Sequence, residues 1–248
     1  MYAQRIRPPA ERSGARRLEL SQPDGTYPGW VVITGPNGAG KSALLARMAA
    51  GDGEVVEPAP RVLAFYDSGR TLPAGDRVAV LLDDLASRAA ADAEGLVLID
   101  EPELHLDLVA QRAVGFRLKE AFPGVQFVVA THSPYACQAA DVAIRLDPGR
   151  TPFRADDDLL HRVIFGSGDD AAQSELFGVV SPYSDGARRL REELVALEMA
   201  VLDGTATPAQ AERFADLRAL LTSSPEARSE EVRARLRRRA AYLRERRA

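Results

Sequence analysis

A glycine-rich loop at residues 35–42 carries the clearest chemistry in this chain. Its sequence, Gly-Pro-Asn-Gly-Ala-Gly-Lys-Ser, fills every position of the phosphate-binding pattern G-x-x-x-x-G-K-[ST]. Glycines let backbone N–H groups turn toward phosphate oxygens, and the start of a following helix adds partial positive charge. In this pattern Lys41 bridges the β- and γ-phosphates, and the Ser42 hydroxyl ligates Mg²⁺. The predicted nucleotide-binding residues are therefore Gly35, Pro36, Asn37, Gly38, Ala39, Gly40, Lys41 and Ser42.

Two adjacent carboxylates could supply the rest of the chemistry. Asp100 and Glu101 directly follow the apolar run 96–99, which is typical of a strand buried on both faces. At the carboxyl end of such a strand, Asp100 can hold Mg²⁺ and Glu101 can take a proton from the water that attacks the γ-phosphate. A solvated acidic turn would explain this pair alone, but the complete phosphate loop favours the catalytic interpretation.

A histidine follows the next apolar strand along the chain. His132 lies in the sequence Ala-Thr-His-Ser-Pro at 130–134, directly after the run 125–130. We expect it at the same sheet edge as Asp100, where it can hydrogen-bond the γ-phosphate or the attacking water. The other two histidines, His105 and His161, are assigned structural roles.

The elements that must position these groups alternate between strand and helix. This alternation predicts an α/β fold with a central, mainly parallel sheet. Short strands at 2–7 and 16–20 predict an N-terminal β-layer. The expected core strands are 30–34, 61–66, 96–99, 125–130 and 142–146, the expected helices are 42–50, 76–93 and 103–121, and residues 51–60 are expected to form a loop.

Together the three motifs resemble those of the ATP-binding-cassette ATPases, in particular the soluble subgroup of repair, chromosome-maintenance and nuclease-associated defence ATPases. Residues 100–107, Asp-Glu-Pro-Glu-Leu-His-Leu-Asp, are similar to its Walker B motif and D-loop, and residues 131–134 to its switch histidine. The resemblance covers about residues 1–148 and implies a P-loop NTPase fold with ATP and Mg²⁺ as cofactors. It also implies an ATP-dependent homodimer, in which Asp107 contacts the opposite subunit and His132 senses the γ-phosphate.

The sequence departs from that family at the loop that contacts the partner's nucleotide. The nearest counterpart of the Leu-Ser-Gly-Gly-Gln signature is Leu-Pro-Ala-Gly-Asp at 72–76, with Gly75 as its nucleotide-facing glycine. Pro73 replaces the serine and offers neither a hydroxyl nor a backbone donor, so contacts across the dimer should be weaker. A plain turn before a helix is the alternative interpretation of this loop. A nucleotide-binding scaffold with little or no hydrolysis is therefore the alternative function.

The chain is also shorter than the family's full domain. Only about thirty residues separate Ser42 from the loop at 72–76, which predicts a reduced helical lobe. No residue can be assigned to stack on adenine; Tyr2, Tyr27 and Trp30 are the candidates, and Trp30 is expected to pack in the core instead.

The part of the chain after residue 150 has a different character. Helical patterns at 185–202, 208–221 and 229–247 predict a C-terminal helical module at 151–248, after an ATPase domain at 1–150. Such modules in the resembling family contact a nuclease, a toxin or DNA. Arginines concentrate at both ends of the chain, with eight in the segment 233–247, so nucleic acid is a possible partner. A solvated helical face or a partner-docking helix is favoured for that segment because it lacks interleaved aromatic residues.

Composition places outer limits on these expectations. The chain has 248 residues, 46% of them hydrophobic, and a formal net charge of −4, enough for one sizeable α/β core. No apolar run is long enough to cross a membrane, so we expect a cytoplasmic protein without a membrane partner. The single cysteine, Cys137, excludes an intrachain disulfide and is expected to be a buried apolar residue.

Overall fold

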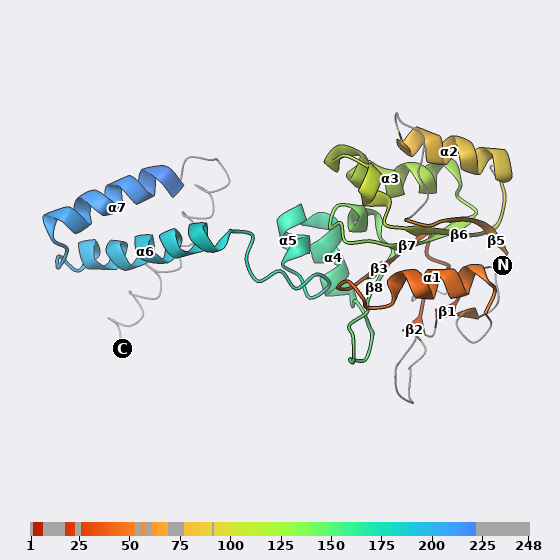
Figure 1. Ribbon diagram of the computed structural model, residues 1–248, viewed down its shortest axis with the longest axis horizontal. Helices are drawn as coiled ribbons and strands as arrows, with labels where there is room; N and C mark the ends of the chain where they lie inside the picture. Colours follow the sequence, from red (N-terminus) through yellow and green to blue (C-terminus); the bar gives the residue numbers. More distant parts are fainter. Residues whose placement is uncertain are drawn as a thin grey trace. The chain divides into compact units, whose positions relative to one another are not determined.

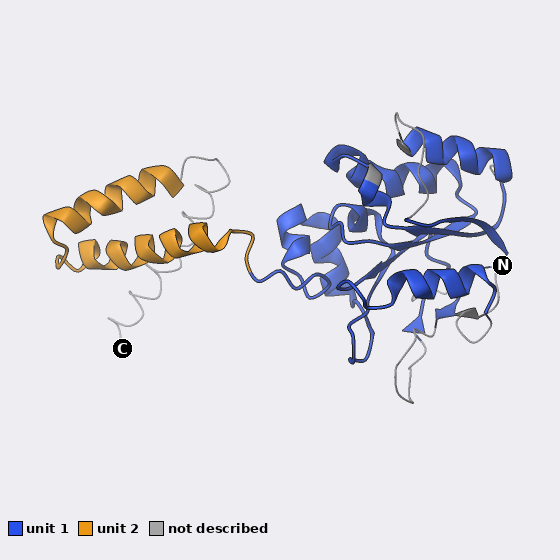
Figure 2. Ribbon diagram, in the orientation of Figure 1, with its two compact units in different colours: residues 1–180 blue, residues 181–248 orange. Residues whose placement is uncertain are grey.

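The computed structural model describes residues 2–6, 18–22, 26–52, 56–57, 61–68, 77–90 and 92–221. It divides the chain into two compact units, Met1–Val180 and Ser181–Ala248 (Figure 2). The phosphate loop, the acidic pair and the histidine after the next strand all belong to the first unit.

A six-stranded sheet forms the centre of the first unit. Its strand order is β5-β6-β7-β3-β8-β9, and every neighbouring pair is parallel except β8 and β9. This confirms the predicted α/β fold and mainly parallel sheet; only the antiparallel edge strand β9 was not predicted. The strands are β3 (Trp30–Thr34), β5 (Val62–Tyr66), β6 (Gly95–Asp100), β7 (Val125–Ala130), β8 (Val142–Arg145) and β9 (Phe153–Arg154).

The central strands are mostly apolar because both faces of the sheet are covered. In β3, Val31 and Ile33 point to one side and Trp30 and Val32 to the other, as the period of two requires. Figure 1 shows helix α1 on one side of the sheet and helices α2 and α3 on the other. The first face packs against α1 (Lys41–Ala49) and the N-terminal strands, and the second against α2 (Arg77–Arg88), α3 (Leu108–Ala121) and α4 (Asp157–Phe165).

The predicted N-terminal β-layer is a separate antiparallel sheet with the order β2-β1-β4. It is attached to the main sheet by Gln126, whose side chain accepts a hydrogen bond from Ala3 N at 2.8 Å and donates one to Ala3 O at 3.1 Å. The third strand, β4, shows that the prediction of a loop over all of residues 51–60 was wrong. The backbone of β4 pairs with β1, and the local sequence carries no signal for a partner fifty residues away. The strands are β1 (Arg5–Ile6), β2 (Leu18–Glu19) and β4 (Val56–Glu57).

The helix predicted at 103–121 is in fact two elements. A 3₁₀ turn, η1 (Pro102–His105), is followed by extended backbone at Leu106, and α3 begins only at Leu108. Asp107 ends the break because its carboxylate accepts a hydrogen bond from Ala110 N at 2.8 Å, which makes it the N-cap of α3. Helix α2 is also shorter than predicted and ends at Arg88.

The first unit continues thirty residues beyond the boundary expected at residue 150. Strand β9 and helices α4 and α5 (Gly168–Ala172), none of them predicted, belong to this unit. Their attachment is polar as well as apolar: Thr34 Oγ1 donates to Leu176 O at 3.0 Å, and Arg145 Nη1 donates to Glu175 O at 2.7 Å. Leu159, Val163 and Leu176 are buried there, so the segment completes the core of the nucleotide-binding unit rather than starting a new one.

The second unit contains the first two of the three helices predicted for it, with the predicted bounds. Helices α6 (Asp185–Leu202) and α7 (Pro208–Leu221) lie side by side as an antiparallel hairpin (Figure 1). Arg213 joins them through two hydrogen bonds to the carboxylate of Glu193, at 2.8 and 3.1 Å. The predicted helix at 229–247 and its arginines lie outside the described residues. No helix in the described part of the chain is long and apolar enough to span a membrane.

Candidate nucleotide site

The register of the sheet brings the three motifs to its carboxyl-terminal edge. Strand β7 lies between β3 and β6, and Ala130 at its end is level with both Ile33 and Asp100. Because all three strands are parallel, the phosphate loop after β3, the acidic pair at the end of β6 and His132 after β7 leave the sheet at the same edge. The three motifs therefore lie at the same sheet edge, as expected for His132 and Asp100 from the sequence.

The phosphate loop needs glycine at positions where other residues would be strained. Gly35, Gly38 and Gly40 have φ values of 138°, 79° and 88°, and Gly40 is the N-cap of α1. At Gly35 a Cβ atom would also lie only 2.0 Å from the carbonyl oxygen of Leu146, which is backbone and cannot move aside. A Cβ atom at Gly38 would meet open space, so glycine is needed there only because of the positive φ.

These two glycines give a matched pair of variants. Gly35→Ala should weaken ATP binding by at least about tenfold and lower the melting temperature, because strain and a backbone clash add. Gly38→Ala should have a smaller effect on both quantities, since only the φ penalty of about 1 kcal/mol applies. Calorimetric titration with ATP and a thermal melt of each variant measure the difference. Equal effects of the two substitutions would contradict this account of the loop.

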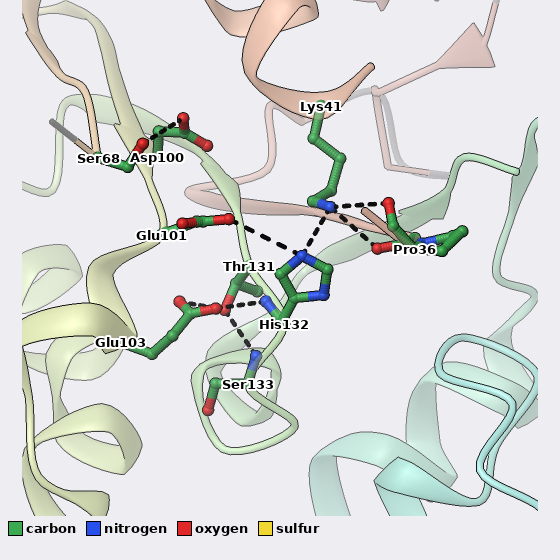
Figure 3. Close-up of polar contacts among 10 residues, drawn as sticks. Pro36, Lys41, Ser68, Asp100, Glu101, Glu103, Thr131, His132 and Ser133 are labelled. Atoms are coloured by element: carbon green, nitrogen blue, oxygen red, sulfur yellow. Dashed lines mark hydrogen bonds and ion pairs between the residues drawn. The ribbon is translucent and has the colours of Figure 1, made fainter. Parts of the chain in front are cut away.

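Lys41 is folded back onto the loop and buried. Its Nζ donates to the carbonyl oxygens of Gly35 at 2.9 Å and Pro36 at 3.2 Å, and it lies 2.9 Å from Nε2 of His132 (Figure 3). Burial lowers the pKa of Lys41, and the carboxylates of Glu101, Asp100 and Glu103 act in the opposite direction. The ammonium is thus held by acceptors that phosphate oxygens can replace.

His132 lies between the lysine and the proposed base. Since an ammonium can only donate, the imidazole Nε2 accepts from Lys41, and a neutral ring then carries its proton on Nδ1. The same Nε2 is 3.8 Å from a carboxylate oxygen of Glu101. Lys41, Glu101 and His132, three residues proposed from the sequence for separate roles, therefore meet at a single ring nitrogen.

Asp100 has the features expected of a metal ligand. Its side chain is buried, its Oδ2 accepts from Ser68 Oγ at 3.3 Å, and its Oδ1 has no hydrogen-bond partner among the described residues. A buried carboxylate oxygen without a partner is costly unless a cation or water is bound to it. Ser42 is exposed on the first turn of α1, so its hydroxyl is accessible. The oxygens of Asp100 and Ser42 are of the type that Mg²⁺ prefers, and the residues present fit this ion.

Glu101 and Glu103 have different environments, and this distinguishes their roles. Glu101 has φ 51° and ψ 58°, the only positive φ of a non-glycine residue in the described chain, a conformation that costs about 1–3 kcal/mol. Glu103 is occupied, since one carboxylate oxygen accepts from Thr131 Oγ1 at 2.6 Å and the other from the backbone N–H of His132. Of these two glutamates, Glu101 is the one whose carboxylate is not held by two protein donors, which supports it as the base.

Other predicted residues do not lie in this cluster. Asp107 is exposed and caps α3, so its expected contact with a partner subunit stays a prediction. The loop 72–76, with Pro73 and Gly75, lies outside the described residues.

The aromatic candidates for adenine stacking lie elsewhere. Trp30 is fully buried, as expected, and donates to Ala136 O at 3.1 Å. Tyr2 and Tyr27 stack on each other with ring centroids 3.6 Å apart, and burial together with Tyr27 raises the pKa of Tyr2 to about 12. Tyr27 donates to Pro123 O, ahead of β7, which puts the pair at the amino edge of the sheet, opposite the phosphate loop. Neither tyrosine is placed to stack on adenine at the other edge.

Three residues of the site were given no role from the sequence: Ser68, Glu103 and Thr131. Glu103 and Thr131 lie inside the Walker B-like and histidine motifs, so their position was available as a signal, but their contacts depend on the pairing of β6 with β7. Ser68 follows β5 with no distinguishing sequence around it.

A family model described as "AAA domain, putative AbiEii toxin, Type IV TA system" matches residues 77–137, a segment that contains Asp100, Glu101 and His132. The curated protein "Retron Ec83 probable ATPase" of Escherichia coli is 46% identical over 50 residues, covering 20% of this chain and 9% of that protein. "Septu protein PtuA" of Bacillus mycoides (strain KBAB4) is 42% identical over 59 residues, covering 23% and 8%. The matched segment is thus similar to an AAA-type domain and to part of a probable ATPase.

The resemblance expected from the sequence is thereby confirmed for the ATPase domain. The matches span less than a tenth of the length of these two curated relatives, so they bear on the domain and not on the whole proteins. A solved structure, the ATP binding subunit of an ABC transporter, aligns with 67% of this chain and 96% of that chain at 15% identity. Its TM-score of 0.39 is too low to carry an argument, and the strand order and the geometry of the three motifs support the assignment instead.

Proposed function

We propose that the ATPase domain binds ATP together with Mg²⁺ and hydrolyses it. The observation that carries this proposal is that Lys41, Glu101 and His132 meet at one sheet edge. Nε2 of His132 lies 2.9 Å from Nζ of Lys41 and 3.8 Å from a carboxylate oxygen of Glu101. Hydrolysis needs a cation for the phosphates, a base for water and a group that contacts the γ-phosphate, and these three side chains are of those types.

Each residue has one task in the proposed reaction. Lys41 leaves the loop carbonyls and His132 for the β- and γ-phosphate oxygens. The oxygen of a water attacks the γ-phosphorus while the bond to the β–γ bridging oxygen breaks, so that ADP leaves and phosphate forms. Glu101 accepts the proton from that water. His132, no longer accepting from the lysine, can carry its proton on Nε2 and donate it to a γ-phosphate oxygen.

Mg²⁺ would be held by the Ser42 hydroxyl and by Asp100, whose buried Oδ1 has no partner in the described part of the chain. When bound, the ion would neutralise charge on the phosphate oxygens. Ser68 would keep the other Asp100 oxygen in place through its hydrogen bond.

We further propose that two copies of the domain pair around ATP. Three exposed apolar side chains lie beside Asp107: Leu104, Leu108 and Val109 are 56%, 61% and 80% exposed. Exposed apolar side chains gathered within one short segment favour burial against a partner. In the proposed dimer Asp107 contacts the opposite subunit and Gly75 faces its nucleotide.

The proposed setting is control of an effector, a nuclease or a toxin, in antiviral defence. Support comes from the names of the relatives, which belong to retron and Septu systems, and from the toxin and toxin–antitoxin terms in the family description. The basic ends of the chain could add contacts with nucleic acid. The alternative, a nucleotide-binding scaffold without hydrolysis, is less well supported because the chain keeps both Glu101 and Asp100, the residue types that hydrolysis needs.

Phosphate release from ATP by the purified protein tests this proposal. We expect steady release with Mg²⁺, loss of release when EDTA removes the ion, and recovery when excess Mg²⁺ is added back. Asp100→Asn should raise the Mg²⁺ concentration needed for half-maximal release by about tenfold, since it loses one charged ligand. ATP binding without phosphate release would establish the scaffold alternative, and release that EDTA leaves unchanged would remove the assigned metal residues.

A further inference from the structure

Glu103 joins the turn after β6 to the loop after β7. Its Oε2 accepts from the Thr131 hydroxyl at 2.6 Å, and its Oε1 accepts from the backbone N–H of His132 (Figure 3). Both carboxylate oxygens are thus used on two consecutive residues of the histidine loop. Charge-assisted hydrogen bonds of this kind are about twice as strong as neutral ones.

The loop that Glu103 contacts is fixed by further bonds on its far side. Thr131 Oγ1 accepts from Ser133 N at 2.9 Å, and Ser133 Oγ donates to Gln111 Oε1 at 2.7 Å. Gln111 in turn donates to Leu106 O at 2.9 Å, so the turn after η1 is attached to the same network. Residues 131–133 are therefore held from two sides, while the imidazole of His132 projects toward Lys41 and Glu101 (Figure 3).

We propose that Glu103 is a positioning residue for His132, and that it couples the orientation of this histidine to the turn that carries Glu101. The proposal rests on the proposed ATP hydrolysis for its functional consequence. Glu103 lies two residues after Glu101, whose backbone is strained, and its side chain joins this turn to the backbone of His132, beside the hydrogen bond from Glu101 N to Ala130 O at 2.8 Å.

The chemistry requires a carboxylate at this position. Thr131 Oγ1 already accepts from Ser133 N and must donate its own hydrogen to Glu103, while His132 N can only donate. Each of the two donors reaches a different oxygen of Glu103, so both of these positions must accept. Glutamine has one acceptor oxygen and an NH₂ group that would face a donor. Glu103→Gln should therefore break the hydrogen bond to either Thr131 or His132.

A double-mutant cycle on ATP hydrolysis separates positioning from general stability. We expect Glu103→Gln to lower kcat about tenfold with KM for ATP within about twofold, because the phosphate loop is untouched. In a His132→Ala background the same substitution should change kcat by less than about twofold, since the residue through which Glu103 acts is gone. Effects that multiply in the double variant would overturn the proposal.

Three further variants control the chemistry of the change. Thr131→Ser keeps the hydroxyl and should retain most of the activity, whereas Thr131→Val removes it and should resemble Glu103→Gln. Glu120→Gln makes the same charge change at an exposed position of α3 and should leave kcat unchanged.

A readout that does not need ATP keeps this proposal distinct from the proposed function. The protein has three histidines, so imidazole ¹⁵N resonances can be assigned by substituting His132. In the nucleotide-free protein we expect Nε2 of His132 to show the shift of an acceptor nitrogen, and Glu103→Ala to move it toward the value of a freely rotating ring. Unchanged resonances would refute the positioning role, whereas changed resonances in a protein that hydrolyses no ATP would refute only the proposed function.

Discussion

Glu101→Gln should reduce the rate of phosphate release by about a hundredfold or more, because an amide cannot accept the proton of the attacking water. Glutamine has nearly the same size and keeps an oxygen near Nε2 of His132, so the site should still bind ATP. We expect the ATP dissociation constant to change by less than about threefold. The effect therefore falls on the chemical step, as a loss of kcat.

The same variant should hold the protein in its ATP-bound form. With hydrolysis stopped and the binding groups intact, light scattering at saturating ATP should show twice the monomer mass. Glu120→Gln, an exposed site on α3, serves as the charge-matched control and should hydrolyse ATP at the wild-type rate. A Glu101→Gln protein that still releases phosphate normally would exclude Glu101 as the base, and a monomer at saturating ATP would exclude the proposed dimer.

Lys41→Ala should weaken ATP binding by about a hundredfold, since it removes charge-assisted hydrogen bonds to phosphate worth about 1.5–3 kcal/mol each. The folded protein should lose little stability. Burial lowers the pKa of Lys41, so its charged form is already disfavoured by desolvation, and two of its partners are carbonyls of an exposed or half-exposed loop. Isothermal titration with ATP measures the affinity, and the melting temperature with and without ATP measures the linked stabilisation.

The only other lysine in the chain provides the opposite control. Lys119 donates to Asp141 Oδ1 at 2.9 Å and to Ala139 O at 3.1 Å, and Asp141 also receives the backbone N–H of Trp30 at the start of β3. Lys119→Ala should therefore lower stability by about 1–2 kcal/mol while ATP affinity stays the same. If both lysine variants lost ATP binding equally, the loss would have to be assigned to folding rather than to the phosphate contacts of Lys41.

Most of the sheet could be predicted because its central strands are apolar on both faces. The apolar runs that form β3, β6 and β7 can be identified without knowing which strands they pair with, since a strand covered on both faces is apolar without alternation. Short elements could not be identified in this way. Strands β4 and β9 have two residues each and exist because a neighbouring strand offers backbone hydrogen bonds. The break between η1 and α3 depends on the Asp107 cap competing with a continuous helix.

The sequence by itself determined the class of site. Gly35, Asp100 and His132 each lie at or just after the end of a strand, and a strand end is a local property that fixes which groups reach the edge of a parallel sheet. Only the tertiary structure decided how those groups meet. Lys41 contacts a histidine 91 positions away, and Glu103 holds residues 28 and 29 positions away. Such contacts depend on the order β6-β7-β3 and its register, which long-range packing sets and no local pattern encodes.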